Sequence, residues 1–381
     1  MKKLIFVLLS CLVGLLFGQG SIGLEFNLIE DGYAFEVSRG IATDTHIDIP
    51  SHKDGIPIVR IADFGFRDSF DILGVRIPNS VRSIGTRAFE DCTGLVSIVI
   101  PSSVTHIESW AFTGCTSLTS IVIPNSVIHV GEGAFSRCSG LTRVSLSNSL
   151  TRIHDSAFLG CTSLTSIVIP HGVTTIGRNA FFGNSSLASV TIPNSVISIG
   201  EGAFFYNASL TEITLPNSIT TIGESAFQNC RSLTSITIPN SVSEIGSSAF
   251  RGCTNLTSVT LPNRLTRISD MMFRDCIHLS NINIPESVMS IGVATFHGCR
   301  SLMNITLPTG LSIIGASAFS GCRNLTRIHI PRDVVSIGSL AFSGCDHLTI
   351  VAETQSQPNG WQHGWNPDER PVVWGERIIR D

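Results

Sequence analysis

The sequence predicts a mostly β fold, a right-handed solenoid of about thirteen stacked 23-residue coils with an N-terminal hairpin cap and a C-terminal cap. Leucine recurs every 23 residues from Leu95 to Leu348, and proline from Pro78 to Pro331 with Ser147 as its exception. A period kept without insertion over residues 70–345 predicts one solenoid whose coils stack on their neighbours. Phenylalanine keeps the same period at Phe66, Phe89, Phe112, Phe135, Phe158, Phe181, Phe204, Phe227, Phe250, Phe273, Phe296, Phe319 and Phe342.

Each coil has a short strand and a closing corner. Residues 95–101 read as a strand, with Ile98 and Ile100 on the inward face and Pro101 as its end. Most coils then carry glycine where this one has Glu108, which predicts a tight turn with positive φ. The pair Ala111 and Phe112 closes the coil, because the small residue leaves space for the ring.

The pattern LxxIxIPxxVxxIGxxAFxxC resembles the leucine-rich repeats of the BspA-like, or Treponema-type, bacterial surface proteins. The resemblance covers twelve full repeats and a variant first coil with a five-residue insertion at residues 51–55. It implies a cell-surface or secreted protein that adheres to host or neighbouring cells by binding a protein, and it implies no enzymatic activity. The expected partner is an unidentified host or cell-surface protein.

Four segments are expected along the chain: a signal peptide at 1–20, an N-terminal cap at 21–43, the leucine-rich repeat solenoid at 44–345 and a C-terminal tryptophan-rich cap at 346–381. Residues 24–37 alternate apolar and polar residues around Asp31 and Gly32, which predicts a hairpin over the first coil. Trp361, Trp365 and Trp374 lie in the tail and are expected to cover the last coil.

The N-terminus has the pattern of a secretory signal peptide. Lys2 and Lys3 precede an apolar run at residues 4–17, and small residues at Gly18 and Gly20 suit cleavage before Ser21. The run is short for a membrane span. We therefore expect a secreted or cell-surface protein without a membrane span. Lipidation at Cys11 is the alternative reading of this segment.

Charge excludes one class of partner. The net charge is −4 and the pI is near 6.3, whereas an electrostatic nucleic-acid binder needs a strongly basic face. We expect no nucleic-acid partner.

Ten cysteines share one repeat position, from Cys92 to Cys345, and Asn184 and Asn207 replace cysteine there in two coils. Asparagine cannot form a disulfide, yet its side chain can bond the backbone of a turn, as a thiol can more weakly. This interchange favours buried free thiols, although stacked coils would also bring the cysteines within bridging distance. A single column of cysteines does not surround a metal ion tetrahedrally.

Catalytic patterns are weak. A polysaccharide-cleaving solenoid needs grouped carboxylates, and Glu212 is the one acid among the outward strand positions. His106 and His129 share a repeat position and are expected to stack, as a solvated pair rather than a metal site. We predict a protein that is not an enzyme and needs no metal or cofactor.

The outward strand face is rich in serine and threonine, and three functions fit it. The face could recognise a protein or a glycan, or its regular rows of hydroxyl groups could bind ice. The third possibility is that the protein is a structural spacer of the cell envelope. Serine and threonine also simply suit exposed strand positions.

The candidate partner-binding residues are Leu159, Phe182, Phe205 and Tyr206. The first three directly follow the repeated phenylalanine in successive coils, where other coils carry mainly polar residues. We expect that position to face solvent, so the three side chains would form an apolar stripe for a protein partner or a second copy of the chain. The alternative is that they pack inward. The oligomeric state stays open.

Overall fold

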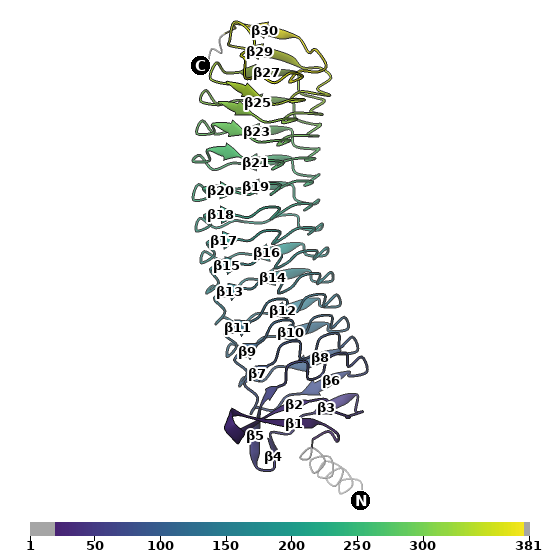
Figure 1. Cartoon of the computed structure of the whole chain (residues 1–381). Coiled ribbons are helices and arrows are strands. Elements are labelled where there is room, and N and C mark those ends of the chain that lie inside the picture. Colours follow the sequence, from purple (N-terminus) through teal and green to yellow (C-terminus); the bar gives the residue numbers. More distant parts are fainter. Residues whose placement is uncertain (1–19, 377–381) are drawn as a thin grey trace, which may run out of the picture. The chain divides into compact units, whose positions relative to one another are not determined.

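The computed structural model describes residues 20–376 (Figure 1). These residues divide into two compact units, one up to Leu164 and one from Thr165 onward. The two units are described one at a time. The predicted signal peptide, Gly20 apart, and the alternative at Cys11 lie outside the described residues, as do residues 377–381. No described helix is long and apolar enough to cross a membrane.

Short strands form the first unit, where the described residues contain no α-helix and one 3-10 turn, η1 (Glu30–Gly32). The strands are β1 (Glu25–Ile29), β2 (Ala34–Ser38), β3 (His46–Asp48), β4 (His52–Lys53), β5 (Ile56–Ile61), β6 (Gly74–Arg76), β7 (Ser83–Ile84), β8 (Ser97–Val99), β9 (His106–Ile107), β10 (Ser120–Val122), β11 (His129–Val130), β12 (Arg143–Ser145) and β13 (Arg152–Ile153). One ladder runs β1-β2-β5-β7-β9-β11, and the outer strands pair as β3-β6-β8 and β10-β12.

The second unit repeats this plan. Its strands are β14 (Ser166–Val168), β15 (Thr175–Ile176), β16 (Ser189–Thr191), β17 (Ser198–Ile199), β18 (Thr221–Ile222), β19 (Ser235–Thr237), β20 (Glu244–Ile245), β21 (Ser258–Thr260), β22 (Arg267–Ile268), β23 (Asn281–Asn283), β24 (Ser290–Ile291), β25 (Asn304–Thr306), β26 (Ile313–Ile314), β27 (Arg327–Ile330), β28 (Ser336–Ile337), β29 (Thr349–Ala352) and β30 (Val372–Trp374). Outer strands pair as β14-β16, β19-β21-β23-β25 and β27-β29-β30, and the short strands as β15-β17-β18-β20 and β22-β24-β26-β28.

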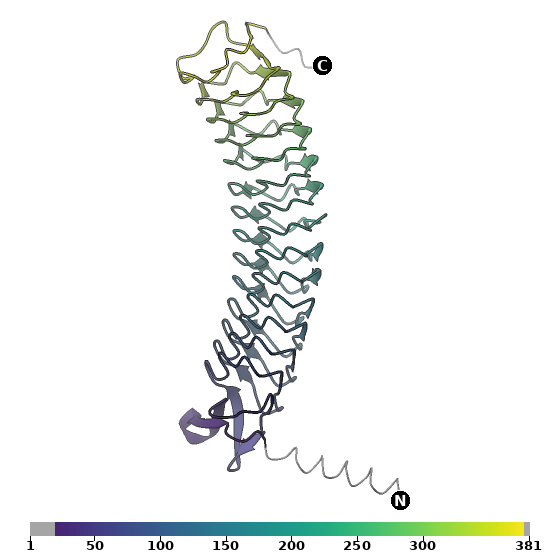
Figure 2. The same ribbon diagram turned by 90° about the vertical axis from the view of Figure 1, so that its right-hand side faces the viewer.

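Strand pairing follows the repeat. Ile199 pairs with Ile222, and Ser235 with Ser258, so each residue lies beside its equivalent 23 positions away. These ladders are parallel, and Figure 2 shows the coils of each unit stacked one on the next. The predicted solenoid of 23-residue coils is confirmed. One expected outer strand does not form, because residues 212–214, which include Glu212, lie outside any strand.

The core is a column of phenylalanine rings. In the first unit, successive rings from Phe66 to Phe158 stack with centroids 5.2–5.5 Å apart. In the second unit, the rings from Phe181 to Phe342 stack at 5.4–5.8 Å. All are fully buried. Burial of one such ring stabilises the fold by about 1.5–3 kcal/mol, and the column repeats this gain in every coil.

The repeated glycine has a different role from the one expected. Gly223 and Gly131 do not have positive φ. A Cβ on Gly223 would lie 2.5 Å from the backbone nitrogen of Glu201, and one on Gly131 would lie 2.5 Å from that of Ser109. Glycine is therefore required because neighbouring coils approach closely here, where the Gly223 amide donates to the Ile199 carbonyl at 2.8 Å.

Two short-strand ladders stop where glycine is replaced. His154 holds the glycine position beside β13, and the ladder of the first unit ends at β11. Ser269 holds it beside β22, and β20 does not pair with β22. Instead, the Ser269 hydroxyl donates to the Ile245 carbonyl at 2.6 Å. Glu108 keeps its ladder bond to Ile84 at 2.9 Å, so loss of glycine alone does not open the ladder.

The N-terminal segment forms the expected hairpin. β1 and β2 pair antiparallel, and β2 then pairs in parallel with β5 of the first coil. The five-residue insertion forms a second antiparallel hairpin, β4 with β5, that turns at Asp54 and Gly55.

At the other end, Trp365 lies 23 residues after Phe342 and its ring meets Phe342 edge-on at 5.8 Å. Trp361 contacts both other tail tryptophans, with centroids 4.7 Å from Trp365 and 5.7 Å from Trp374.

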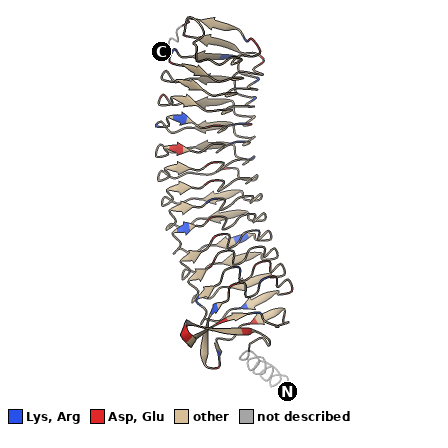
Figure 3. Ribbon diagram, viewed as in Figure 1, with Lys and Arg blue, Asp and Glu red and all other residues tan. Residues whose placement is uncertain are grey.

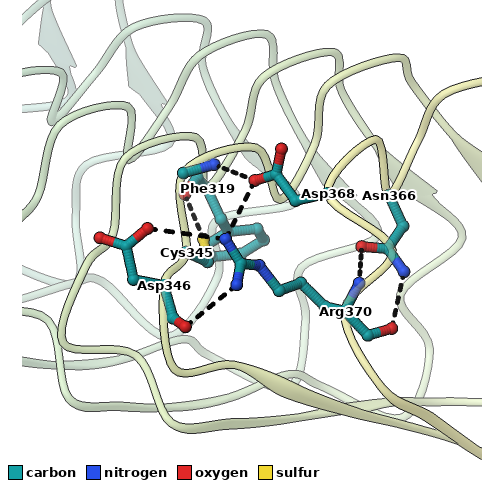
Figure 4. A network of polar contacts seen from close by, with 7 residues as sticks. Phe319, Cys345, Asp346, Asn366, Asp368 and Arg370 are labelled. Carbon is teal, nitrogen blue, oxygen red and sulfur yellow. Dashed lines mark hydrogen bonds and ion pairs between the residues drawn. The ribbon is translucent and has the colours of Figure 1, made fainter.

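A polar network ties the tail to the last coil (Figure 4). The Arg370 guanidinium lies 3.5 Å from the Asp346 carboxylate and 3.3 Å from that of Asp368, and Asp368 accepts the Gly344 amide at 2.6 Å. The boundaries of the two predicted caps remain predictions.

Candidate functional site

The residue that follows each core phenylalanine lies on a sharp corner. The next position has positive φ: 74° at Gly114 and 59° at Tyr206. This corner lays the preceding side chain against the following coil, so Thr113 is 1% exposed and its hydroxyl donates to the Gly133 carbonyl at 2.7 Å. The expectation that this position faces solvent is wrong for Thr113, whereas Arg67 at the same position is exposed. Leu159, Phe182 and Phe205 are each half-buried.

Three of the four predicted residues meet in space. We call Phe182, Phe205 and Tyr206 the aromatic cluster. Phe182 meets Phe205 edge-on at 5.0 Å, Tyr206 stacks on Phe205 at 4.5 Å, and Phe182 lies 6.1 Å from Tyr206. Tyr206 is 44% exposed, so it is the most accessible of the three rings. Leu159 belongs to the first unit and is described separately from this cluster.

A groove of about 510 Å³ starts at Tyr206 and runs over the following coils of the second unit. Its charged and polar lining includes Arg231, Arg251, Asn255 and His278. Sequence reasoning missed these residues, because they come from different repeat positions that only coil stacking brings together. A comparison of whole columns would have found part of the pattern, since Arg231, Arg300 and Arg323 share one position.

A second groove, of about 700 Å³, coincides with the ladder interruption at Ser269. Thr221, Glu244 and Arg267 line it together with Ser269. Arg267 is already paired with Asp270 at 2.8 Å. The groove is a consequence of the separated strands β20 and β22.

The predicted histidine pair gains a third member. His106 and His129 lie 5.9 Å apart, and the ring of His154 meets His129 edge-on at 4.9 Å. Burial, reinforced by His129 and Arg152, lowers the pKa of His154. Among the described residues, no group of three or more His, Cys, Asp or Glu side chains is placed to hold a metal ion.

The ten described cysteines are buried free thiols. Each donates to a phenylalanine carbonyl in the preceding coil, as Cys253 does to Phe227 at 3.1 Å. Burial raises the pKa of Cys138 and of Cys253 to about 12. A protonated and inaccessible thiol is a poor nucleophile, so the column serves packing and turn formation.

The outer strand face is exposed at alternate positions, as expected. In the first unit Val99 is 77% exposed and Val122 is 65% exposed beside the outward serines. Few residues along the strands are Lys, Arg, Asp or Glu (Figure 3). Among the described residues, the outward positions of these strands hold no pair of adjacent carboxylates and no unbroken row of threonines.

Three overlapping matches to the family model described as "BspA type Leucine rich repeat region (6 copies)" span residues 59–188, 178–302 and 266–357. Together they cover residues 59–357, more than half of the 381-residue chain. No curated protein matches the chain.

Solved structures give the same architecture. A leucine-rich repeat protein from Bacteroides ovatus is 28% identical, with a TM-score of 0.75 over 92% of this chain and 98% of that chain. The pneumococcal vaccine antigen PcpA is 18% identical, with a TM-score of 0.57 over 95% of this chain and 99% of that one. A leucine-rich repeat protein from Eubacterium ventriosum is 22% identical, with a TM-score of 0.50 over 89% and 95%. The last two show a shared fold alone.

Proposed function

The chain belongs to the BspA-type leucine-rich repeat family, and from this premise we propose that it is an exported or cell-surface protein that binds a partner protein through the aromatic cluster. The family is one of repeat scaffolds, and its matches indicate no catalytic family. The proposed role is adhesion to a host or neighbouring cell, without catalysis.

The observation that carries this proposal is the exposed edge of the aromatic cluster. Phe182, Phe205 and Tyr206 form a contiguous apolar surface at a corner where neighbouring coils carry Gln228 and Arg251. Exposed apolar clusters mark interaction surfaces, and tyrosine is enriched among the residues that dominate binding energy. The pattern of Lys2, Lys3 and the apolar run that follows supports export.

The test compares three proteins in retention of biotin-labelled surface proteins from cultured cells. They are the unmodified chain, a cluster variant (Phe205→Ser with Tyr206→Ser), and a control variant (Ile197→Ser with Ile313→Ser). The control residues are 48% and 46% exposed and lie outside the cluster. We expect at least one protein that the unmodified chain and the control retain and the cluster variant loses. Its affinity is then measured with purified partner.

Thermal unfolding of the variants separates binding from packing. A cluster variant that loses its partner and keeps its melting temperature supports the site. A large fall in melting temperature shows that the rings are core. If no protein is retained by any of the three, the proposal fails in favour of an envelope spacer or of glycan or ice binding by the strand face.

Export has its own test. The full chain is produced in a bacterial host, the cells are fractionated, and the N-terminus of the exported form is sequenced. We expect an exported protein that begins near Ser21. A chain that stays in the cytoplasmic fraction with residues 1–20 intact contradicts this part of the proposal.

A further inference from the structure

The groove beside Tyr206 carries an excess of positive charge. Among its lining residues, Arg231 and Arg251 are cationic, and Asp275 is the one carboxylate. That carboxylate is already paired with Arg274 at 3.4 Å. Neither Arg231 nor Arg251 has an ion pair with a described residue. Two guanidinium groups therefore lie along the groove without an ion pair to any residue that the structure describes.

The positive charge continues past the groove. Arg231, Thr254, Ile277, Arg300 and Arg323 share one repeat position, so they form a row across five successive coils of the second unit. Arg300 and Arg323 are exposed. This basic row belongs to a chain with a net charge of −4, so it is a local feature and not the average of the surface.

The groove also has an apolar part. Tyr206 forms one end, and Ile277, which is half-buried, lies in the row between Thr254 and Arg300. The His278 ring is exposed and its Nδ1 lies 2.7 Å from the Thr254 carbonyl oxygen, which fixes the ring beside the groove. A ligand that satisfies both parts must carry both negative charges and apolar side chains.

We propose that this groove binds an acidic, apolar segment of the partner protein in an extended conformation. The inference rests on the proposed function and names the chemistry of its partner. Three coil-to-coil steps separate Tyr206 from His278, which is about 14 Å at the spacing of stacked strands and accommodates about four residues of extended peptide. Arginine pairs with carboxylates through two parallel hydrogen bonds, which favours aspartate or glutamate in the segment. A sulfated glycan would satisfy the arginines but has no apolar side chain to place against Ile277 and Tyr206.

The test uses defined probes and the full chain. Fluorescence anisotropy measures the Kd of a labelled peptide that alternates aspartate with leucine, of the same peptide with asparagine in place of aspartate, and of a sulfated oligosaccharide. The groove variant is Arg231→Glu with Arg251→Glu. The matched control is Arg143→Glu with Arg264→Glu, two exposed arginines outside the groove.

We expect the acidic peptide to bind the unmodified chain and the control alike, and its Kd to rise about tenfold or more in the groove variant. The Kd should also rise between about 50 and about 300 mM salt. Arg231→Gln with Arg251→Gln should show an intermediate loss, and thermal unfolding checks that each variant is folded.

Equal binding of the asparagine peptide overturns the inference, as does an unchanged Kd in the groove variant. Binding of the sulfated oligosaccharide without the acidic peptide assigns the groove to a polyanionic glycan and also overturns it. These outcomes are independent of the proposed function. A surface protein lost by the cluster variant and kept by the groove variant leaves the proposed function standing and removes this inference alone.

Discussion

The side-chain amide of Asn207 donates a hydrogen bond to the carbonyl of Phe181 at 3.0 Å. In the next coil, the thiol of Cys230 makes the same contact with Phe204 at 3.2 Å. Both side chains are fully buried. In these two coils a buried side-chain donor satisfies a carbonyl of the preceding coil, and this contact needs no covalent partner.

This relationship predicts the state of the cysteine column. Burial raises the pKa of Cys92 and Cys345 to about 12, and of Cys276 well above its usual range. At about pH 8 the thiols are therefore protonated and shielded. We expect the ten cysteines to be alkylated slowly in the folded protein. After unfolding without reductant, most of them should be alkylated, as measured by mass spectrometry. A disulfide between neighbours such as Cys253 and Cys276 would instead show that the column cross-links the coils covalently.

The phenylalanine column predicts a contrast between two adjacent aromatic positions. Phe227→Ala should lower the free energy of unfolding by about 3–5 kcal/mol, because the stacked coils cannot close the gap left by a fully buried ring. Phe205→Ala removes a half-buried ring that contacts two other aromatic residues, and should cost about 1–2 kcal/mol. Chemical denaturation measures both. Equal losses would mean that the inward face is misassigned.

Close approach of coils at the repeated glycine predicts a position-specific penalty. Gly223→Ala places a methyl group against the Glu201 backbone and should cost about 1–3 kcal/mol. Gly310→Ala is the matched control, since a Cβ at that position would have no atom within 4 Å beyond its chain neighbours, and the φ of Gly310 is not positive. The control should leave the melting temperature unchanged or raise it slightly. A harmless Gly223→Ala would refute the close-approach explanation.

The interruption at Ser269 predicts a reversible local opening. Ser269→Gly removes the side chain that holds the Ile245 carbonyl and restores the glycine that most coils carry at this position. We expect slower hydrogen exchange of the amides at residues 268–269 in this variant, read by mass spectrometry. Unchanged exchange would indicate that β20 and β22 are held apart by another contact.

The three-histidine stack predicts a pH effect on stability. The pKa of His154 is lowered from 6.5 by burial and then by His129 and Arg152, while Asp155 opposes this shift. Between the folded and unfolded pKa values the unfolded chain binds more protons, so stability decreases as the pH falls below about 6.5 and levels off below the folded pKa.

The measurement compares melting temperatures at about pH 7.5 and about pH 5.5. On acidification, the melting temperature of the His154→Gln variant should fall less than that of the unmodified chain. His297 and His329 also have lowered pKa values, so some loss remains in the variant. An equal or larger loss in the variant would contradict the assignment to His154.

Periodicity alone was enough to predict the fold and its inward face, because each core position recurs with the same residue type, as at Phe227 and Cys253. The corners were harder to predict. The corner residue has positive φ whether it is Gly114, Arg137 or Tyr206. Its residue type therefore does not predict the corner, nor that the side chain before the corner packs against the next coil. The groove at Arg231 was not predictable from one coil, since its walls come from several coils.

The absence of insertions across the regular coils has a consequence for how such a chain changes length. Within the second unit, Phe227, Phe250 and Phe273 have interchangeable neighbours. A genetic duplication or loss of 23 codons there leaves every ring with an equivalent partner and creates no mismatched junction. Surface residues at the corner are then brought one coil nearer or farther apart while the interior is unaltered. The length of the solenoid and the spacing of its contact surfaces can therefore change by one coil at a time in evolution. Such a change needs no compensating mutation in the core.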